Sequence, residues 1–184
     1  TLLAVHPHSP EGKGAAKKLQ KLRLEALNRT LSNIKKPSII QHRLAYFLAD
    51  APKEDLKAAK GLLEHIVRAF EKAKVLNDKT ALLLGRALVS GGAKINGARL
   101  LQRVAQDSAD LKLEAARAFA DGGDASTAYA ILEEIAQRSP TARLMQAQLQ
   151  LQKFRDPEQA KPILAAIIND KGAAPEVMAH TYLH

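Results

Sequence analysis

Apolar residues along this chain recur with the spacing of an α-helix. Four stretches begin with an alanine that is followed by aliphatic residues or alanine three and seven positions later, and they start at Ala59, Ala98, Ala128 and Ala160. Positions i, i+3 and i+7 lie on one face of a helix, so each stretch can bury a single stripe against a neighbour. The pattern predicts four helices with these alanines at equivalent positions.

A first helix is predicted before each of these four. Each first helix carries a pair of residues and a larger apolar residue after it: Leu44-Ala45 with Leu48, Leu84-Gly85 with Leu88, Ala115-Ala116 with Phe119, and Ala147-Gln148 with Leu151. Small residues in most of these pairs let two helix axes come close. Between the first and second helices stand the short segments 50–52, 90–92, 121–123 and 153–155, most of them rich in Gly, Pro or Asp, which favour turns. Each pair of helices is therefore predicted to form an antiparallel hairpin.

Acidic residues mark the predicted starts of the second helices. Asp55, Asp124 and Asp156 each stand four residues before the alanine, where a carboxylate can accept from the free N–H groups of the first turn. Lys94 takes this place in the second hairpin. We therefore expect Asn96 to cap that helix and to shorten it by about two residues.

The hairpins repeat with an irregular period. The alanines are 39 (98 − 59), 30 (128 − 98) and 32 (160 − 128) residues apart, and the long first step contains the charged segment 70–78, which we expect to be a solvated extension or loop. The predicted fold is all-α, an α-solenoid of antiparallel helical hairpins. Its modules are residues 41–77, 78–110, 111–139 and 140–171 with a partial module at 172–184, preceded by a basic helical segment at 1–40 that is predicted to be a partial repeat.

Two stretches of this pattern resemble Sel1-like repeats, a subset of the tetratricopeptide superfamily. They are residues 83–101, with Leu84-Gly85 and the turn Gly91-Gly92, and residues 115–135. The segment 124–136 is also similar to a module of the periplasmic tetratricopeptide lipoproteins of alginate secretion. That resemblance implies a periplasmic, outer-membrane-associated scaffold in an exopolysaccharide export complex, with a cytoplasmic protein as the alternative. The lipidated cysteine of such a protein would have to lie upstream of Thr1.

Composition narrows the classes of function. Aromatic residues make up 4% of the chain and Trp is absent, which favours helices over sheets. Cysteine is absent, which excludes disulfides, thiolate metal sites and a cysteine nucleophile. No Gly-x-Ser-x-Gly, Gly-x-x-x-x-Gly-Lys or His-Glu-x-x-His motif occurs, and no apolar run reaches the roughly 18 residues that span a bilayer. We expect no enzyme, no catalytic residue, no cofactor, no metal and membrane contact only through an anchor outside this chain.

Positive charge gathers near the N-terminus. The net charge is +9, and residues 1–60 contribute 12 Lys and Arg against 5 Asp and Glu, which is +7. A basic patch is predicted at Lys13, Lys17, Lys18, Lys21 and Arg23. It is either the solvated face of a terminal helix or a site for an anionic polysaccharide or lipid. Nucleic acid is disfavoured because no aromatic residue is interleaved for base stacking.

A second candidate surface is a ridge of large side chains on the first helices. Tyr46, Arg86 and Arg117 occupy one repeated position, and Tyr and Arg carry much of the binding energy in protein interfaces. They could also merely cover apolar surface with their stems. The sequence thus predicts a non-catalytic scaffold whose partners are other proteins, such as subunits of an envelope or secretion assembly. The alternative is a basic module that grips an anionic polymer through residues 13–60.

Overall fold

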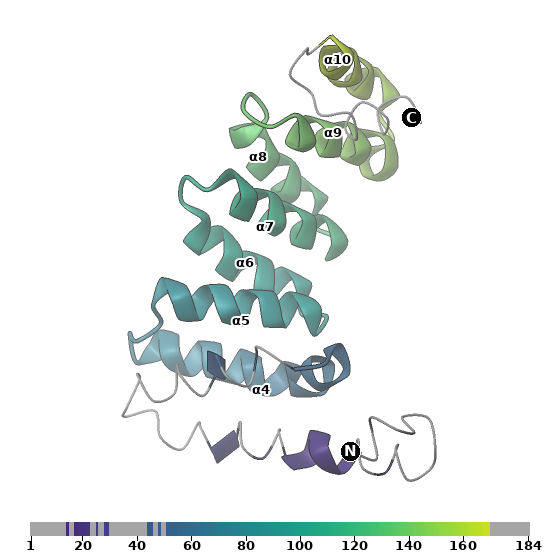
Figure 1. The fold of residues 1–184 in the computed structure, drawn as a ribbon. Helices are drawn as coiled ribbons and strands as arrows, with labels where there is room; N and C mark the ends of the chain where they lie inside the picture. The colour runs from purple at the N-terminus through teal and green to yellow at the C-terminus, as the bar shows by residue number, and fades with distance from the viewer. Residues whose placement is uncertain are drawn as a thin grey trace. The chain divides into compact units, whose positions relative to one another are not determined.

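The computed structural model is all-helical in the part of the chain that it describes, which comprises residues 14, 17–22, 25, 28–29, 44–45, 48 and 51–169. The helices are α4 (Lys53–Lys72), α5 (Asp78–Ser90), α6 (Lys94–Ala105), α7 (Ala109–Asp121), α8 (Ala125–Ile135), α9 (Pro140–Leu149), the π-helical turn η1 (Gln150–Phe154) and α10 (Pro157–Ile168) (Figure 1). The all-α prediction is confirmed for these residues. The chain divides into two compact units, Thr1–Ala93 and Lys94–His184.

The core of the first unit lies where α4 packs against α5. Ala59, Leu63 and Ile66 of α4 have no exposed surface, and neither has Leu84 of α5. These α4 residues stand at i, i+4 and i+7 and form one apolar stripe. The spacing predicted Leu62 at i+3 in this stripe, but Leu62 is only half-buried and Leu63 takes its place.

The expectation of a solvated extension at residues 70–78 is wrong at both ends of the segment. Phe70 stands four residues after Ile66, continues the same stripe and has no exposed surface. α4 runs on to Lys72, and Leu76 is buried as well. Asn77 then caps α5 by accepting a hydrogen bond from the N–H of Thr80 at 2.9 Å. The charged residues between Phe70 and Leu76 are exposed, but they connect two helices whose ends are anchored in the core.

In the second unit each helix from α6 to α10 packs against the next one along the chain. The repeated alanines Ala98, Ala128 and Ala160 have no exposed surface, and the residues seven positions later, Ala105, Ile135 and Ile167, are buried too. The small side chain of alanine lets the axes of two packed helices come close to each other. The burial of these alanines, predicted from their spacing, is confirmed.

Two of the predicted turns share one backbone geometry. Gly92 and Gly123 have φ angles of 89° and 94°, in the left-handed region that favours glycine. After each of them an N–H donates back to the preceding helix, from Ala93 to the carbonyl of Leu88 at 2.8 Å and from Asp124 to that of Phe119 at 2.9 Å. The same motif therefore ends α5 and α7.

The predicted acidic caps are confirmed at two of three helices. The carboxylate of Asp124 accepts from the N–H of Thr127 and that of Asp156 from the N–H of Gln159, both at 3.1 Å. The cap at Asp55 is wrong, because α4 begins two residues earlier, after Pro52, and Asp55 lies buried inside the first turn.

The expected cap at Asn96 is wrong as well. α6 begins at Lys94, so Asn96 lies within its first turn. The Nζ of Lys94 binds Asp121 at the end of α7, at 3.2 Å from the carboxylate and 3.4 Å from the carbonyl oxygen. A lysine at that place interacts favourably with the carbonyl end of α7.

The predicted turn at 153–155 is only partly right. The first helix continues from α9 into the π-helical turn η1 and ends at Arg155, whose φ is 57°. Phe154 packs edge-on against Tyr129 of α8, with ring centroids 6.0 Å apart.

Within the described residues the arrangement is helical and repeat-like, and helices adjacent in the chain of each unit pack together. The superhelical arrangement of hairpins and the boundaries of the modules stay predictions.

Candidate functional site

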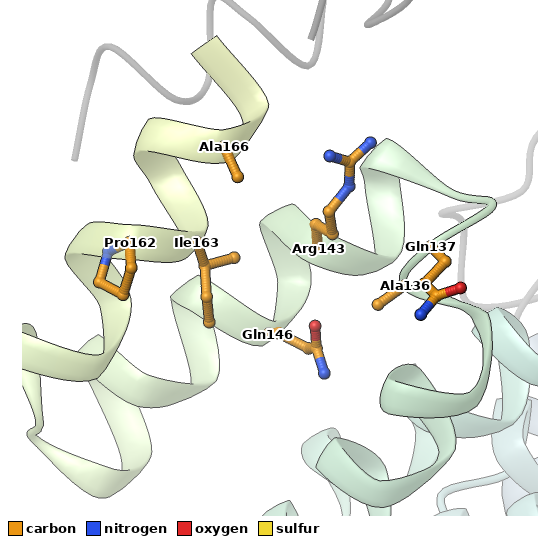
Figure 2. Close-up of a pocket in the computed structure, with 7 residues that line it drawn as sticks. All are labelled: Ala136, Gln137, Arg143, Gln146, Pro162, Ile163 and Ala166. Carbon is orange, nitrogen blue, oxygen red and sulfur yellow. The ribbon is translucent and has the colours of Figure 1, made fainter. Parts of the chain in front are cut away.

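The second unit contains a hollow of about 410 Å³ between the end of α8, α9 and α10. Its lining consists of Ala136, Gln137, Arg143, Gln146, Pro162, Ile163 and Ala166. Figure 2 shows Ile163 and Ala166 on α10 facing the hollow, with Ala136 and Gln137 on the opposite side. Pockets that hold small groups are commonly of this size and mostly apolar.

Three elements position these side chains. α9 begins at Pro140 after Ser139, whose hydroxyl accepts from the N–H of Ala142 at 3.2 Å, so the first turn of α9 is fixed. Arg143 and Gln146 then follow three residues apart, which places them on one side of α9. Leu144 and Ile167 are buried together and join α9 to α10.

The lining combines an apolar surface with a cation and an amide. Gln146 is only 5% exposed and occupies the buried stripe of α9 between Ala142 and Leu149. Arg143 is half-buried and takes part in an interaction of its own. No acidic residue, histidine or hydroxyl group belongs to the lining of this hollow. The arrangement can therefore bind an apolar group, with Arg143 beside it to attract negative charge.

Two of the three residues of the predicted ridge are described by the structure, and they lie in different units. Arg86 is exposed on α5 in the first unit and is engaged in an interaction, and Arg117 is exposed on α7 in the second unit. Tyr46 lies outside the described residues. The binding role of these three residues stays a prediction.

Part of the predicted basic patch is helical and exposed. Lys17, Lys18 and Lys21 are all exposed, whereas Lys13 and Arg23 lie outside the described residues. Between these lysines Gln20 holds the segment to the start of α4, donating from Nε2 to the carboxylate of Asp55 at 3.2 Å. The three exposed lysines therefore flank a side chain that is held to the first unit.

Two leucines add an apolar component to this surface. Leu19 is 39% exposed and Leu22 is 53% exposed. Sequence reasoning registered only the charges here. Leucines next to lysines make the surface amphipathic as well as basic.

The residues of the hollow were also missed by sequence reasoning. Gln146 stands four residues after the buried Ala142, so a polar residue on a predicted core stripe was the available signal. The sequence around Arg143 could not indicate that it lines a hollow, because most of the other lining residues come from the end of α8 and from α10.

Two kinds of feature are absent from the described residues. Among them, no group of three His, Cys, Asp or Glu side chains is placed to hold a metal ion. Within the same part of the chain, no helix combines the length and the apolar character that a membrane span requires.

In its described part the chain is an all-helical protein with a repeat-like arrangement of helices. In comparisons with known proteins, no family model, no curated protein and no solved structure matches the chain. The resemblance to Sel1-like and tetratricopeptide repeats accordingly stays a prediction from the residues.

Proposed function

We propose that this protein is a non-catalytic scaffold that binds a segment of a partner protein in the hollow between α8, α9 and α10. The observation that carries the proposal is the lining of the hollow, where Ile163, Pro162 and two alanines surround a space of about 410 Å³ beside Arg143. An apolar surface that is left open on a folded unit is typical of a recognition site.

The charge of the residues that line the hollow indicates which kind of partner segment would bind there. Arg143 brings the only formal charge among the lining residues, and its guanidinium can bind a carboxylate through two parallel hydrogen bonds. The buried amide of Gln146 can donate and accept for a peptide backbone. We expect a partner segment with an aliphatic side chain next to an Asp, a Glu or a chain-terminal carboxylate.

The setting that we propose is a bacterial envelope assembly, in the periplasm, for exopolysaccharide export. This part rests on the sequence resemblance of residues 124–136 alone.

A photo-crosslinking experiment tests the binding site. A photoreactive amino acid is placed at Ala166, which lines the hollow, or at Ala165, the next residue, which is exposed and does not line it. The full chain is expressed in its source cells and irradiated. A discrete protein adduct that forms from position 166 and not from position 165 is expected. Equal adduct patterns at the two positions, or none at either, would refute a partner in the hollow.

The second candidate function is the binding of an anionic polymer by the basic patch. It is favoured by the exposure of all three described lysines, Lys17, Lys18 and Lys21, on one short helical segment. Such binding depends on the release of counterions and weakens steeply as salt is added.

A further inference from the structure

Residues 17–22 are helical and combine exposed leucines with exposed lysines. Leu22 is 53% exposed, which makes it the most exposed large apolar side chain among the described residues, and Leu19 is 39% exposed. A single exposed leucine is ordinary on a protein surface. Two of them within about one turn of a helix form a small apolar surface that stays in contact with water.

Gln20 fixes the orientation of this helical segment in the first unit. Its Nε2 donates to the carboxylate of Asp55 at 3.2 Å and to the carbonyl oxygen of Glu54 at 3.5 Å, both in the first turn of α4. Successive helical residues are turned by about 100°, so Leu22 and Lys18, two positions to either side of Gln20, lie about 160° away from it. The segment therefore presents Leu22 and Lys18 on the side opposite to Gln20, in agreement with their exposure.

The leucines and the lysines occupy neighbouring strips of the segment. Residues three or four apart are neighbours on a helix surface, so Leu19 adjoins Leu22, and Lys17 adjoins Lys21. Lys18 is a neighbour of both Lys21 and Leu22 and links the two strips. All five side chains are exposed. The segment thus carries a cationic strip directly beside an apolar one.

The surrounding sequence has a strong excess of positive charge. Residues 1–40 contain eight Lys and Arg and two Glu, so their net charge is +6 (8 − 2). Such a charge attracts an anionic surface. The ligand that complements the segment is therefore anionic and also offers an apolar phase to the leucines.

We propose that residues 17–22 rest on the surface of a bilayer rich in anionic phospholipids, with Leu19 and Leu22 entering the boundary between headgroups and acyl chains. The neighbouring lysines bind the lipid phosphates, as in amphipathic helices that lie in a membrane interface. A hydrated anionic polymer also matches the lysines, but it leaves the leucines in water. A membrane contact of this kind differs from the anchor outside this chain that the sequence predicts. It needs no membrane-spanning helix, because the segment lies in the plane of the interface.

Flotation of the full chain with lipid vesicles tests the proposal. Vesicles of equal parts phosphatidylglycerol and phosphatidylcholine should bind the chain at least about ten-fold more tightly than vesicles of phosphatidylcholine alone, because each lysine near an anionic surface contributes to binding. Replacing Leu19 and Leu22 by Ser keeps every charge and should weaken binding to the mixed vesicles by about ten-fold. Equal binding to both kinds of vesicle, or no binding to the mixed vesicles at low salt, would overturn the proposal.

A matched variant separates this surface from a general loss of apolar area. Phe154 and Ile168 are 41% and 39% exposed and belong to the second unit. Phe154→Ser combined with Ile168→Ser therefore removes two apolar side chains of similar exposure from elsewhere in the chain. This control should bind the mixed vesicles within about two-fold of the unchanged chain. If the leucine variant binds as tightly as the control, the lysines act alone and the lipid interface is refuted.

A reporter of burial distinguishes a bilayer from other ligands. The chain has no native cysteine, so Leu22→Cys can carry a single fluorophore whose emission shifts to the blue in an apolar environment. We expect this shift with the mixed vesicles and none with alginate, which offers charge without an apolar phase. A shift with alginate as large as with vesicles would overturn the proposal. A shift without lipid that grows with protein concentration would do so too, because a second copy would then cover the leucines. None of these results depends on whether the hollow binds a partner.

Discussion

Gly91 lies against the backbone of Leu56, because a Cβ atom at Gly91 would come within 2.7 Å of the Leu56 carbonyl oxygen. Gly122 holds the equivalent place after α7, but there the nearest atom is the terminal Cδ1 of Ile95, at 2.6 Å. Both glycines have φ near −80°, so the close approach and not the backbone conformation explains the glycine. The two turns therefore differ in their nearest neighbour. Gly91 faces main-chain atoms of Leu56, whereas Gly122 faces the side chain of Ile95, which can move.

This difference predicts unequal costs for the same substitution. Gly91→Ala should lower the free energy of unfolding of the first unit by about 1–3 kcal/mol, because α4 and α5 must move apart. Gly122→Ala should cost less than about 1 kcal/mol in the second unit, because Ile95 can change rotamer and the unfolded chain loses entropy. Urea unfolding followed by hydrogen exchange of each unit measures both values. Equal losses would contradict the assignment of the contacts.

The acidic caps predict a second set of stability changes. Asp124→Ala and Asp156→Ala should each cost about 1 kcal/mol, because each removes the acceptor for an N–H in the first turn of α8 or α10. Asp107→Ala, at an exposed position between α6 and α7, should stay within about 0.5 kcal/mol of the parent chain. Thermal unfolding compares the three. A cost at Asp107 as large as at the caps would mean that net charge, rather than capping, is responsible.

The buried position of Asp55 predicts a larger loss of stability in the first unit. It is 5% exposed and its carboxylate accepts a hydrogen bond from the half-buried Gln20, so Asp55→Ala should cost about 1–3 kcal/mol by removing a hydrogen bond to a charged group. Glu54→Ala changes the neighbouring exposed carboxylate and serves as the control. Urea unfolding of both variants gives the comparison, and a loss at Asp55 no greater than at Glu54 would show that the contact with Gln20 contributes nothing.

The basic patch predicts salt-sensitive binding to a polyuronate. Replacing Lys17, Lys18 and Lys21 by Gln should weaken binding of labelled alginate at low salt by about ten-fold or more and reduce the salt dependence, because fewer counterions are released. The control replaces three exposed lysines of α4, Lys57, Lys60 and Lys72, and should change binding less. Fluorescence anisotropy over a salt series measures both. If the unchanged chain does not bind alginate at low salt, the second candidate function fails.

The sequence contained enough to predict the helices and their buried stripes. Ala59, Ala98, Ala128 and Ala160 have no exposed surface, and the caps at Asp124 and Asp156 are where the spacing placed them. These features depend on residues that are close together along one helix, so a local pattern records them.

The remaining features depend on contacts between elements. Asp55 accepts a hydrogen bond from Gln20, 35 residues away, and Lys94 at the start of α6 binds Asp121, 27 residues away. The hollow is lined by residues from the end of α8, from α9 and from α10. The spacing of residues within α9 alone therefore could not predict it. Local spacing could therefore predict the helices but not the candidate site.

The affinity of the partner segment for two variants of α10 tests the central proposal most directly. The segment that crosslinks through position 166 is synthesised and titrated calorimetrically into the unchanged chain, the Ala166→Arg variant and the Ala165→Arg variant. We predict that Ala166→Arg weakens binding by at least about ten-fold, since it fills the hollow and adds a charge next to Arg143, and that Ala165→Arg changes it by less than about two-fold. Equal affinities for the two arginine variants would contradict the hollow as the binding site.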